Sequence, residues 1–316
     1  MLPEALLIVS FGGPGGPEEV MPFLRNVARG RNISDERLAQ VAEHYYLFDG
    51  ISPLNKANRQ LVAALSSELA KRGVPIPVYL GNRNAPPMLV DAVAQMSNDG
   101  ISEAVACVTS AFGSYAGCRQ YAEDIAQARK AVGPRASAIH KLPPFWNQEG
   151  FLAVMGQHLA AALQQEPDAA VVFTAHSLPQ TMAATAPYAA QLYEACSAVA
   201  ERAHCANWRL AYQSRSGLPQ VPWLEPDVCE ELERLPATGV EAVILVPIGF
   251  VADHMEVVYD LDIEARKRAD SLGLRFQRVP TVGVHPTFVA MIAQLAIGSI
   301  PSPCPAHCCL YSPKPA

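Results

Sequence analysis

Short apolar runs alternate along the chain with longer stretches in which apolar residues recur every three or four positions. The short runs predict strands, and the longer stretches predict amphipathic helices. The predicted strands cover residues 5–11, 77–81, 103–110, 170–175, 209–213 and 242–247. Asn55 is predicted to cap a helix that runs to Gly73, and another helix is expected between Cys118 and Gly133.

This alternation predicts an α/β fold with parallel sheets and helices on both faces. The pattern restarts after Gly150, so we expect two α/β domains, residues 1–150 and 151–298. A helix near residues 286–297 is expected to pack back on the first half, which would make that domain discontinuous. The regular pattern ends at Gly298, and residues 299–316 form a cysteine-rich tail.

Composition and charge narrow the class of protein. The chain has 316 residues, of which 50% are hydrophobic and 17% charged, enough to build a sizeable core. A net charge of −6 without a basic block argues against a nucleic-acid partner. No apolar run approaches the roughly 18 residues that span a bilayer, and the apolar amino end is expected to be a strand. We therefore expect a soluble, cytoplasmic protein.

Ligands of parallel sheets bind beyond the carboxyl ends of the strands, so the residues that follow each strand are candidates for chemistry. His176 follows the apolar run 170–175. A neutral imidazole there suits proton abstraction or metal ligation, and a capping or core histidine is the alternative.

Three acidic residues, Glu256, Asp260 and Glu264, follow the run 242–247 at intervals of four. In an α-helix that spacing drifts by about 40° per step, and a π-type widening would align the carboxylates better. They form either a solvated acidic face or a line of hard oxygen ligands and proton carriers from Glu256 to the surface.

Arg29 and Arg31 bracket a glycine, and Tyr45 and Ser52 follow shortly after. The arginines form either a solvated helix end or a fork for substrate carboxylates, to which Tyr45 and Ser52 could add hydrogen bonds. The glycine-rich loop 12–17 does not match a dinucleotide-binding motif, and a wide loop that admits a flat ligand fits it better.

The cysteines fall into two groups. Cys304, Cys308 and Cys309 crowd into the tail, which in a cytosolic protein favours metal ligation over disulfides. Zinc ligation, with His307 as a further ligand, and free thiols are alternatives for these cysteines. The remaining cysteines apart from Cys118 are expected to be small core residues, namely Cys107, Cys196, Cys205 and Cys229.

Several segments together resemble the ferrochelatase family, in the family's order and over about residues 5–298. They are LIVSFGGPGGPEEV, HYYLFDGISPLN, TSAFGSYAGCRQYAEDI, VVFTAHSLP, AYQSRSGLPQVPWLEP and VPIGFVADHMEVVYDLDIEA. The AHSLP and DHxExxYxxD pieces are the most specific.

The resemblance implies two Rossmann-like domains that flank a porphyrin cleft. His176 matches the family's active-site histidine, and Glu256 matches the carboxylate that faces it across the macrocycle. Asp260 and Glu264 match the acidic line behind that glutamate. The positions that match propionate contacts are Arg29, Tyr45, Ser52 and Tyr121, with Arg31 as a weaker match. Phe11 stands where some relatives place an iron-ligating tyrosine, so no axial ligand is expected from that side chain.

The tail sequence from Cys304 to Cys309 resembles that of actinobacterial-type ferrochelatases, which implies a non-catalytic [2Fe–2S] cluster on Cys118, Cys304, Cys308 and Cys309. The implied reaction is insertion of Fe²⁺ into coproporphyrin III by a monomeric enzyme. Protoporphyrin IX is the alternative substrate, and a sirohydrochlorin chelatase and a non-catalytic haem carrier are more distant alternatives.

Overall fold

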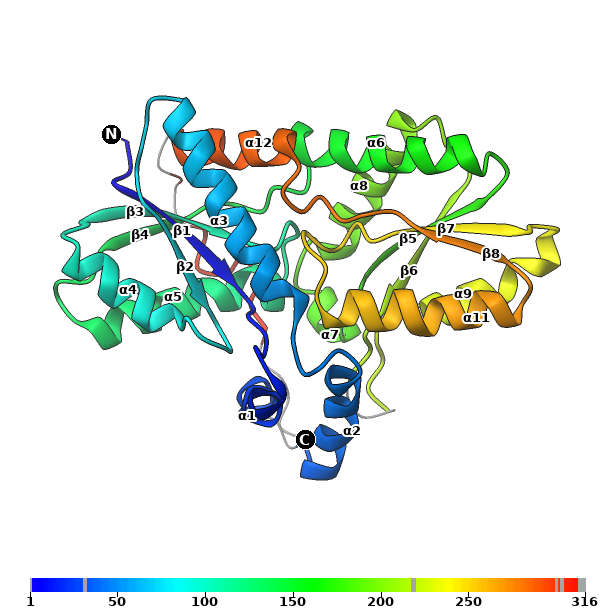
Figure 1. The fold of residues 1–316 in the computed structure, drawn as a ribbon, viewed down its shortest axis with the longest axis horizontal. Helices are drawn as coiled ribbons and strands as arrows, with labels where there is room; N and C mark the ends of the chain where they lie inside the picture. The colour runs from blue at the N-terminus through cyan, green and yellow to red at the C-terminus, as the bar shows by residue number, and fades with distance from the viewer. Residues whose placement is uncertain (1, 31–32, 217–219, 299–300, 302–303, 312–316) are drawn as a thin grey trace.

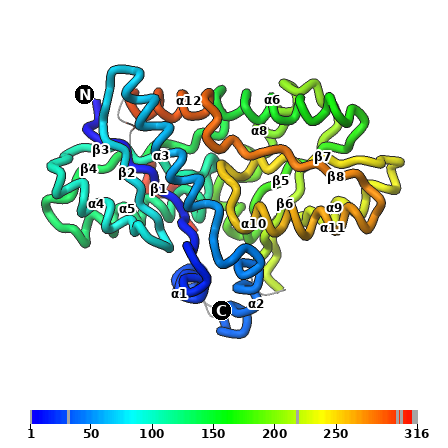
Figure 2. Tube along the Cα trace, viewed as in Figure 1, coloured from blue at the N-terminus to red at the C-terminus, as the bar shows by residue number. Residues whose placement is uncertain are grey.

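The computed structural model describes residues 2–30, 33–216, 220–298, 301 and 304–311. Its strands form two parallel four-stranded sheets, one from each half of the chain (Figures 1 and 2). The strand orders are β2-β1-β3-β4 and β6-β5-β7-β8. The strands are β1 (Ala5–Ser10), β2 (Val78–Asn82), β3 (Glu103–Val108), β4 (Ala138–Lys141), β5 (Ala170–His176), β6 (Trp208–Gln213), β7 (Ala242–Val246) and β8 (Arg275–Arg278).

The predicted parallel α/β fold is confirmed, and every predicted strand is present. The hydrophobic pattern missed β4 and β8, which form edges of the two sheets. Both are short and half-buried along most of their length, so neither carries the continuous apolar run of a central parallel strand.

Helices cover both faces of the first sheet. Leu6 and Ile8 of β1 pack with α3 and α12, whereas Leu7 and Val9 pack on the opposite face with α4 and α5 (Figure 1). These helices are α3 (Pro53–Lys71), α4 (Leu89–Asn98), α5 (Gln120–Val132) and α12 (Pro286–Ala296). The alternation follows from the strand period of two, which sends successive side chains to opposite faces.

The second sheet is covered in the same way. Val171 and Phe173 of β5 pack on the side of α6 (Glu149–Gln165) and α8 (Tyr188–Arg202). Val172 packs on the other side, with α9 (Val228–Arg234) and the helical run from η3 (Val258–Ala265) into α11 (Arg266–Ser271). The remaining helical segments are α1 (Pro17–Val27), α2 (Asp35–Tyr46), η1 (Tyr115–Arg119), α7 (Gln180–Ala183), η2 (Pro236–Thr238) and α10 (Met255–Val257).

The helix α12 returns to the first half of the chain and contacts both α3 and α6. Arg72, at the carboxyl end of α3, donates hydrogen bonds to the Ala290 carbonyl (3.0 Å) and to Gln294 Oε1 (2.7 Å). One hydrophobic cluster consequently runs from β1 through α6 and α12 to β5. The domain boundary near residue 150 stays a prediction. None of the described helices combines the length and apolarity that a bilayer crossing needs.

The predicted cap of α3 was wrong. Ser52 is the N-cap residue, and its Oγ accepts a hydrogen bond from the Leu54 backbone N–H (3.4 Å). Pro53 opens the helix, a position that suits proline because its missing N–H would be unpaired there in any case. Asn55 lies inside the first turn, and its Nδ2 donates to the Gly13 carbonyl (2.6 Å), which ties α3 to the glycine-rich loop.

Candidate active site

The two predicted catalytic residues meet at one edge of the second sheet. Since β5 and β7 are neighbouring parallel strands, the residues that follow them lie side by side. His176 is the last residue of β5, and Glu256 lies in α10, beyond the loop that follows β7. His176 Nε2 is 3.5 Å from Glu256 Oε1, and the side chains keep 30% and 47% of their surface exposed, so a substrate can reach them.

Backbone contacts fix the imidazole of His176. Its Nδ1 donates to the Ser177 carbonyl, which leaves Nε2 directed at Glu256. The Tyr188 hydroxyl donates to the His176 carbonyl (2.9 Å) from α8. The Nδ1 contact sets which nitrogen faces Glu256, and therefore which nitrogen can exchange a proton there.

The two side chains form an ion pair. Burial by itself would lower the pKa of His176, but the charge and hydrogen bonding of Glu256 raise that pKa to about 9. Burial would likewise raise the pKa of Glu256, but the His176 charge and hydrogen bond, with His254, hold it at about 2. At neutral pH the pair is therefore an imidazolium beside a carboxylate.

His254 is a second imidazole beside Glu256, with Nδ1 3.9 Å from Oε2 of that carboxylate. Burial lowers the pKa of His254, which keeps this ring neutral beside the charged His176. We did not select His254 from the sequence, although it stands within the DHxExxYxxD pattern. The sequence signal that could have identified His254 is its position in the loop that follows the predicted strand 242–247.

The acidic line lies on a widened turn. Asp260 and Glu264 belong to η3, a π-helix. This is the widening that aligns carboxylates four residues apart better than an α-helix does. Asp260 is half-buried, whereas Glu256 and Glu264 are exposed, so both ends of the line reach solvent. Burial raises the pKa of Asp260 to about 7, and the nearby Glu256 and Glu264 charges add to the rise.

Two side chains at the end of β6 support this line, and the sequence reasoning missed both. Ser214 Oγ donates to Asp260 Oδ2, which opposes the rise in the pKa of that carboxyl. Gln213 Nε2 donates to the Glu256 carbonyl (2.8 Å) and lies 3.5 Å from Asp260 Oδ2. Gln213 pairs with His176 in the sheet, so the strand-end rule that selected His176 would have selected its neighbour too.

The candidate propionate-binding residues come from the first half of the chain. Arg29 is exposed just beyond α1, and Tyr45 lies near the end of α2. The pKa of Tyr45 is raised by burial and then by the Glu256 and Asp260 charges, so its phenol lies near the acidic pair. Arg31 lies outside the described residues.

Ser52 and Tyr121 are more enclosed. Ser52 is 3% exposed and already caps α3, although its hydroxyl hydrogen stays available to a ligand. Tyr121 in α5 is 6% exposed, and the Arg83 guanidinium carbon lies 5.6 Å from its ring centre. Substrate contact through these side chains stays a prediction.

The expected placement of Glu256 across the macrocycle from His176 stays a prediction. The family resemblance placed Glu256 across the macrocycle from His176, but in this structure the two side chains contact each other directly. A ring between them would need a gap of about 7 Å, since each non-bonded contact takes ~3.5–4 Å. His44 of α2 also stacks on Tyr259 of η3, with ring centres 3.7 Å apart, so the two halves of the chain touch beside the pair.

The proposed cluster cysteines come from two separate parts of the chain, residue 118 and the tail. Cys118 lies in η1, and Lys141 Nζ donates to its Sγ (3.2 Å). In the tail, the Sγ atoms of Cys308 and Cys309 are 3.7 Å apart. Burial raises the pKa of Cys309 to about 12, and Cys308, Cys118 and Cys304 add to the rise, so the four thiols lie in one neighbourhood.

Four thiols are the type of ligand that an iron–sulfur cluster takes. Their sulfur atoms, however, do not lie in the positions of a complete ligand set. Over the described ranges, no group of three or more histidine, cysteine or acidic side chains has the geometry of a metal site. Of the other cysteines, Cys107 and Cys196 are buried as predicted, whereas Cys205 and Cys229 are only partly buried.

The fold and the strand-end site define the class of protein as a chelatase-type α/β protein. The structure of CbiX, described as the terminal enzyme for biosynthesis of siroheme in denitrifying bacteria, superposes with a TM-score of 0.56 at 17% identity, covering 92% of this chain and 97% of that one. SirB from Bacillus subtilis with Fe³⁺ superposes with a TM-score of 0.55 at 12% identity, covering 93% and 96%. At these identities the likeness concerns the fold alone.

The family is settled by sequence. The family model described as Ferrochelatase matches residues 3–299. The ferrochelatase of Rhodopirellula baltica is 43% identical, with 98% of this chain and 94% of that one covered. The coproporphyrin III ferrochelatases of Nocardia farcinica and Mycolicibacterium smegmatis are 43% and 47% identical, covering 100% and 92% of this chain and 99% and 88% of theirs. The chain belongs to the ferrochelatase family and is a metal-insertion enzyme.

Proposed function

We propose that the chain inserts Fe²⁺ into coproporphyrin III to give iron coproporphyrin, and that His176, Glu256, Asp260 and Glu264 carry the reaction. The observation that carries the proposal is the His176–Glu256 pair at the strand ends, with the acidic line leading away from it. The printed names of the actinobacterial relatives favour coproporphyrin III over protoporphyrin IX.

The residues proposed to bind the porphyrin lie in the first half of the chain. Coproporphyrin III carries four propionates, and a guanidinium binds a carboxylate through two parallel hydrogen bonds. Arg29 is exposed and therefore available for such a contact, while Tyr45 and Ser52 would donate single neutral hydrogen bonds. Tyr121 and Arg31 complete the proposed set.

Iron entry releases two pyrrole protons, and His176 accepts one of them. It must first be neutral, whereas beside the Glu256 carboxylate it is protonated. Fe²⁺ bound at Glu256 would cancel the charge that holds the His176 proton, so that metal entry and loss of that proton are linked. Asp260 accepts the proton that His176 first loses and then the second pyrrole proton, and passes each toward Glu264 and solvent, since a carboxyl with a pKa of about 7 both accepts and releases protons at neutral pH. Iron enters and leaves as Fe²⁺, so the step needs no reductant.

We further propose that Cys118, Cys304, Cys308 and Cys309 hold a [2Fe–2S] cluster. Its support is the shared neighbourhood of the four thiols, and thiolates are the usual ligands of such clusters. The cluster would supply structural support and redox sensing, away from the insertion chemistry. Absorption and EPR spectra of the protein purified without oxygen test it, with Cys309→Ser as the variant. Zinc in metal analysis, or no metal at all, would contradict it.

The proposed setting is the cytoplasm, where the enzyme acts as a monomer. Its support is the composition of the chain and the absence of a membrane-spanning helix among the described residues. Light scattering of the full chain tests the oligomeric state, and a mass twice that of the 33.9 kDa chain would contradict a monomer.

The experiment that tests the substrate is a comparison of coproporphyrin III and protoporphyrin IX under anaerobic conditions with Fe²⁺, followed through the porphyrin absorption bands. We expect faster conversion of coproporphyrin III. Preference for protoporphyrin IX would keep the enzyme class and overturn the substrate. Binding of both rings without insertion would contradict the proposed reaction.

A further inference from the structure

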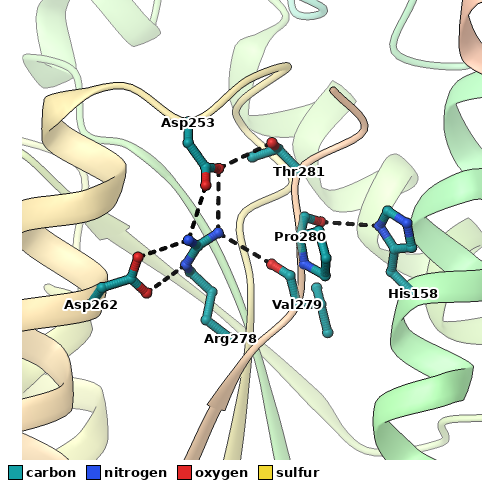
Figure 3. Close-up of polar contacts among 7 residues, drawn as sticks. All are labelled: His158, Asp253, Asp262, Arg278, Val279, Pro280 and Thr281. Atoms are coloured by element: carbon teal, nitrogen blue, oxygen red, sulfur yellow. Dashed lines mark hydrogen bonds and ion pairs between the residues drawn. The ribbon is translucent and has the colours of Figure 1, made fainter. Parts of the chain in front are cut away.

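An arginine outside the catalytic pair holds two aspartates of the catalytic segment. Arg278 is the last residue of β8, and its guanidinium contacts Asp262 and Asp253 (Figure 3). Nε and Nη2 donate to the two Asp262 oxygens at 2.6 and 2.7 Å. Nη2 and Nη1 also donate to the two Asp253 oxygens at 3.0 and 3.3 Å.

The two aspartates flank the residues that carry the chemistry. Asp253 immediately precedes His254 in the loop before Glu256, and Asp262 lies two residues beyond Asp260 in the π-helix η3. One side chain therefore ties the loop to the widened turn. Arg278 is 12% exposed, so its pairs are better shielded than ordinary surface pairs, which contribute little.

Further hydrogen bonds fix the segment that follows Arg278. Thr281 Oγ1 donates to Asp253 Oδ1 (3.0 Å), and His158 Nδ1 of α6 donates to the Pro280 carbonyl (3.1 Å), as Figure 3 shows. The segment from β8 toward α12 is thus fixed to the loop on one side and to α6 on the other. A planar guanidinium that binds in a fork fixes both the distance and the orientation of its partner.

We infer that Arg278 is a positioning residue for iron insertion, which holds the loop and η3 so that Glu256 stays directed at His176 and Asp260 stays beside Ser214. This inference rests on the proposed function. Arg278 also occupies the oxygens of Asp253 and Asp262 and offsets part of their charge, so the carboxylates of this segment that remain available to a metal are those of the Glu256 line.

The test is Arg278→Lys, which keeps the charge but removes the planar fork. We expect kcat for Fe²⁺ insertion to fall about 10- to 100-fold, because small displacements of reacting groups cost that much. The KM for porphyrin should stay within about twofold, since the propionate-binding residues lie elsewhere. Because a partly unfolded preparation also loses apparent kcat at constant KM, kcat is expressed per porphyrin-binding site, with the number of sites measured by titration with coproporphyrin III.

Arg275→Lys is the matched control. Arg275 lies at the other end of β8 and also holds two carboxylates, Glu166 (3.0 Å) and Glu241 (3.3 Å), but it is exposed and far along the strand from the site. Its replacement should leave kcat and KM unchanged. Should Arg278→Lys fail to fold, Asp262→Asn removes the fork to η3 alone and should lower kcat in the same way.

The failures of the two proposals can be told apart. Wild-type protein that inserts no iron would contradict the proposed function. Active wild-type protein with an Arg278→Lys variant of unchanged kcat, or with a loss that appears only in the porphyrin KM, would overturn the role of Arg278.

Discussion

At the scale of single residues, Glu256 and Asp260 lie one turn apart and carry opposite pKa shifts. The ion pair with His176 overrides burial and holds the pKa of Glu256 at about 2, whereas burial and neighbouring carboxylates raise the pKa of Asp260 to about 7. Two like groups with separated pKa values are typical of sites that divide roles between them. Glu256, which stays ionised at neutral pH, suits a ligand for the incoming metal, and Asp260 suits a proton carrier.

Ser214→Ala tests this division. The Ser214 hydroxyl donates to the ionised Asp260 carboxyl and so lowers its pKa. Without that donor the pKa rises further, Asp260 stays protonated to higher pH, and insertion slows near neutrality. We expect the acid limb of the kcat profile to move to higher pH by about 1–2 units, the effect of one hydrogen bond to a charged group.

The matched control for that profile is Ser66→Ala, which removes a serine hydroxyl bonded to the Val62 carbonyl on the exposed side of α3. Its pH profile should equal that of the wild type. An acid limb that stays in place in Ser214→Ala, or moves to lower pH, would contradict the role given to Asp260.

At the scale of elements, the sequence predicted the strands that consist of apolar runs. It missed an edge strand and a side-chain contact that depend on tertiary structure. The buried runs located the central strands, and the strand-end rule selected His176 and Glu256. Edge strand β8 was missed because half-exposed residues carry no apolar run. The strand-end rule could have selected Ser214, which follows the predicted strand 209–213, but its contact with Asp260 depends on the strand order of the sheet, which no local pattern encodes.

The caps of α2 and α3 allow a stability effect to be separated from a binding effect. Ser34 and Ser52 cap these helices through hydrogen bonds from the Arg37 and Leu54 backbone N–H groups. Either serine replaced by alanine should lower the free energy of unfolding by about 0.5–2 kcal/mol in denaturant titrations. Only Ser52→Ala should also raise the KM for porphyrin, and an equal KM in both variants would remove Ser52 from the substrate site.

At the scale of the whole molecule, the two sheets are joined by shared packing. The cluster around α6 and α12 contains core residues of both sheets, and Arg72 ties α3 to α12. Beside the His176–Glu256 pair, His44 stacks on Tyr259 across the two halves. The relative position of the halves therefore depends on these contacts.

Gly150 is the tightest point of this packing. A Cβ there would lie 2.5 Å from Met291 Cβ and 3.0 Å from the Thr287 carbonyl oxygen. Gly150→Ala gains about 1 kcal/mol of helix propensity, but overpacking of this severity costs about 3 kcal/mol, so we expect a net loss of about 2 kcal/mol. Denaturant unfolding measures it, and an unchanged or higher midpoint would show that α6 and α12 are not held at this spacing.

The most direct test of the central claim is anaerobic Fe²⁺ insertion into coproporphyrin III by His176→Ala, compared with His140→Ala. His140 forms a similar pair with Glu103 (3.0 Å), but at the start of β3, the edge of the first sheet opposite the strand ends. We predict that His176→Ala binds the porphyrin with unchanged fluorescence quenching and loses insertion by about 100-fold or more, as expected for loss of a proton acceptor. His140→Ala should insert iron at the wild-type rate. Wild-type insertion by His176→Ala would contradict the account.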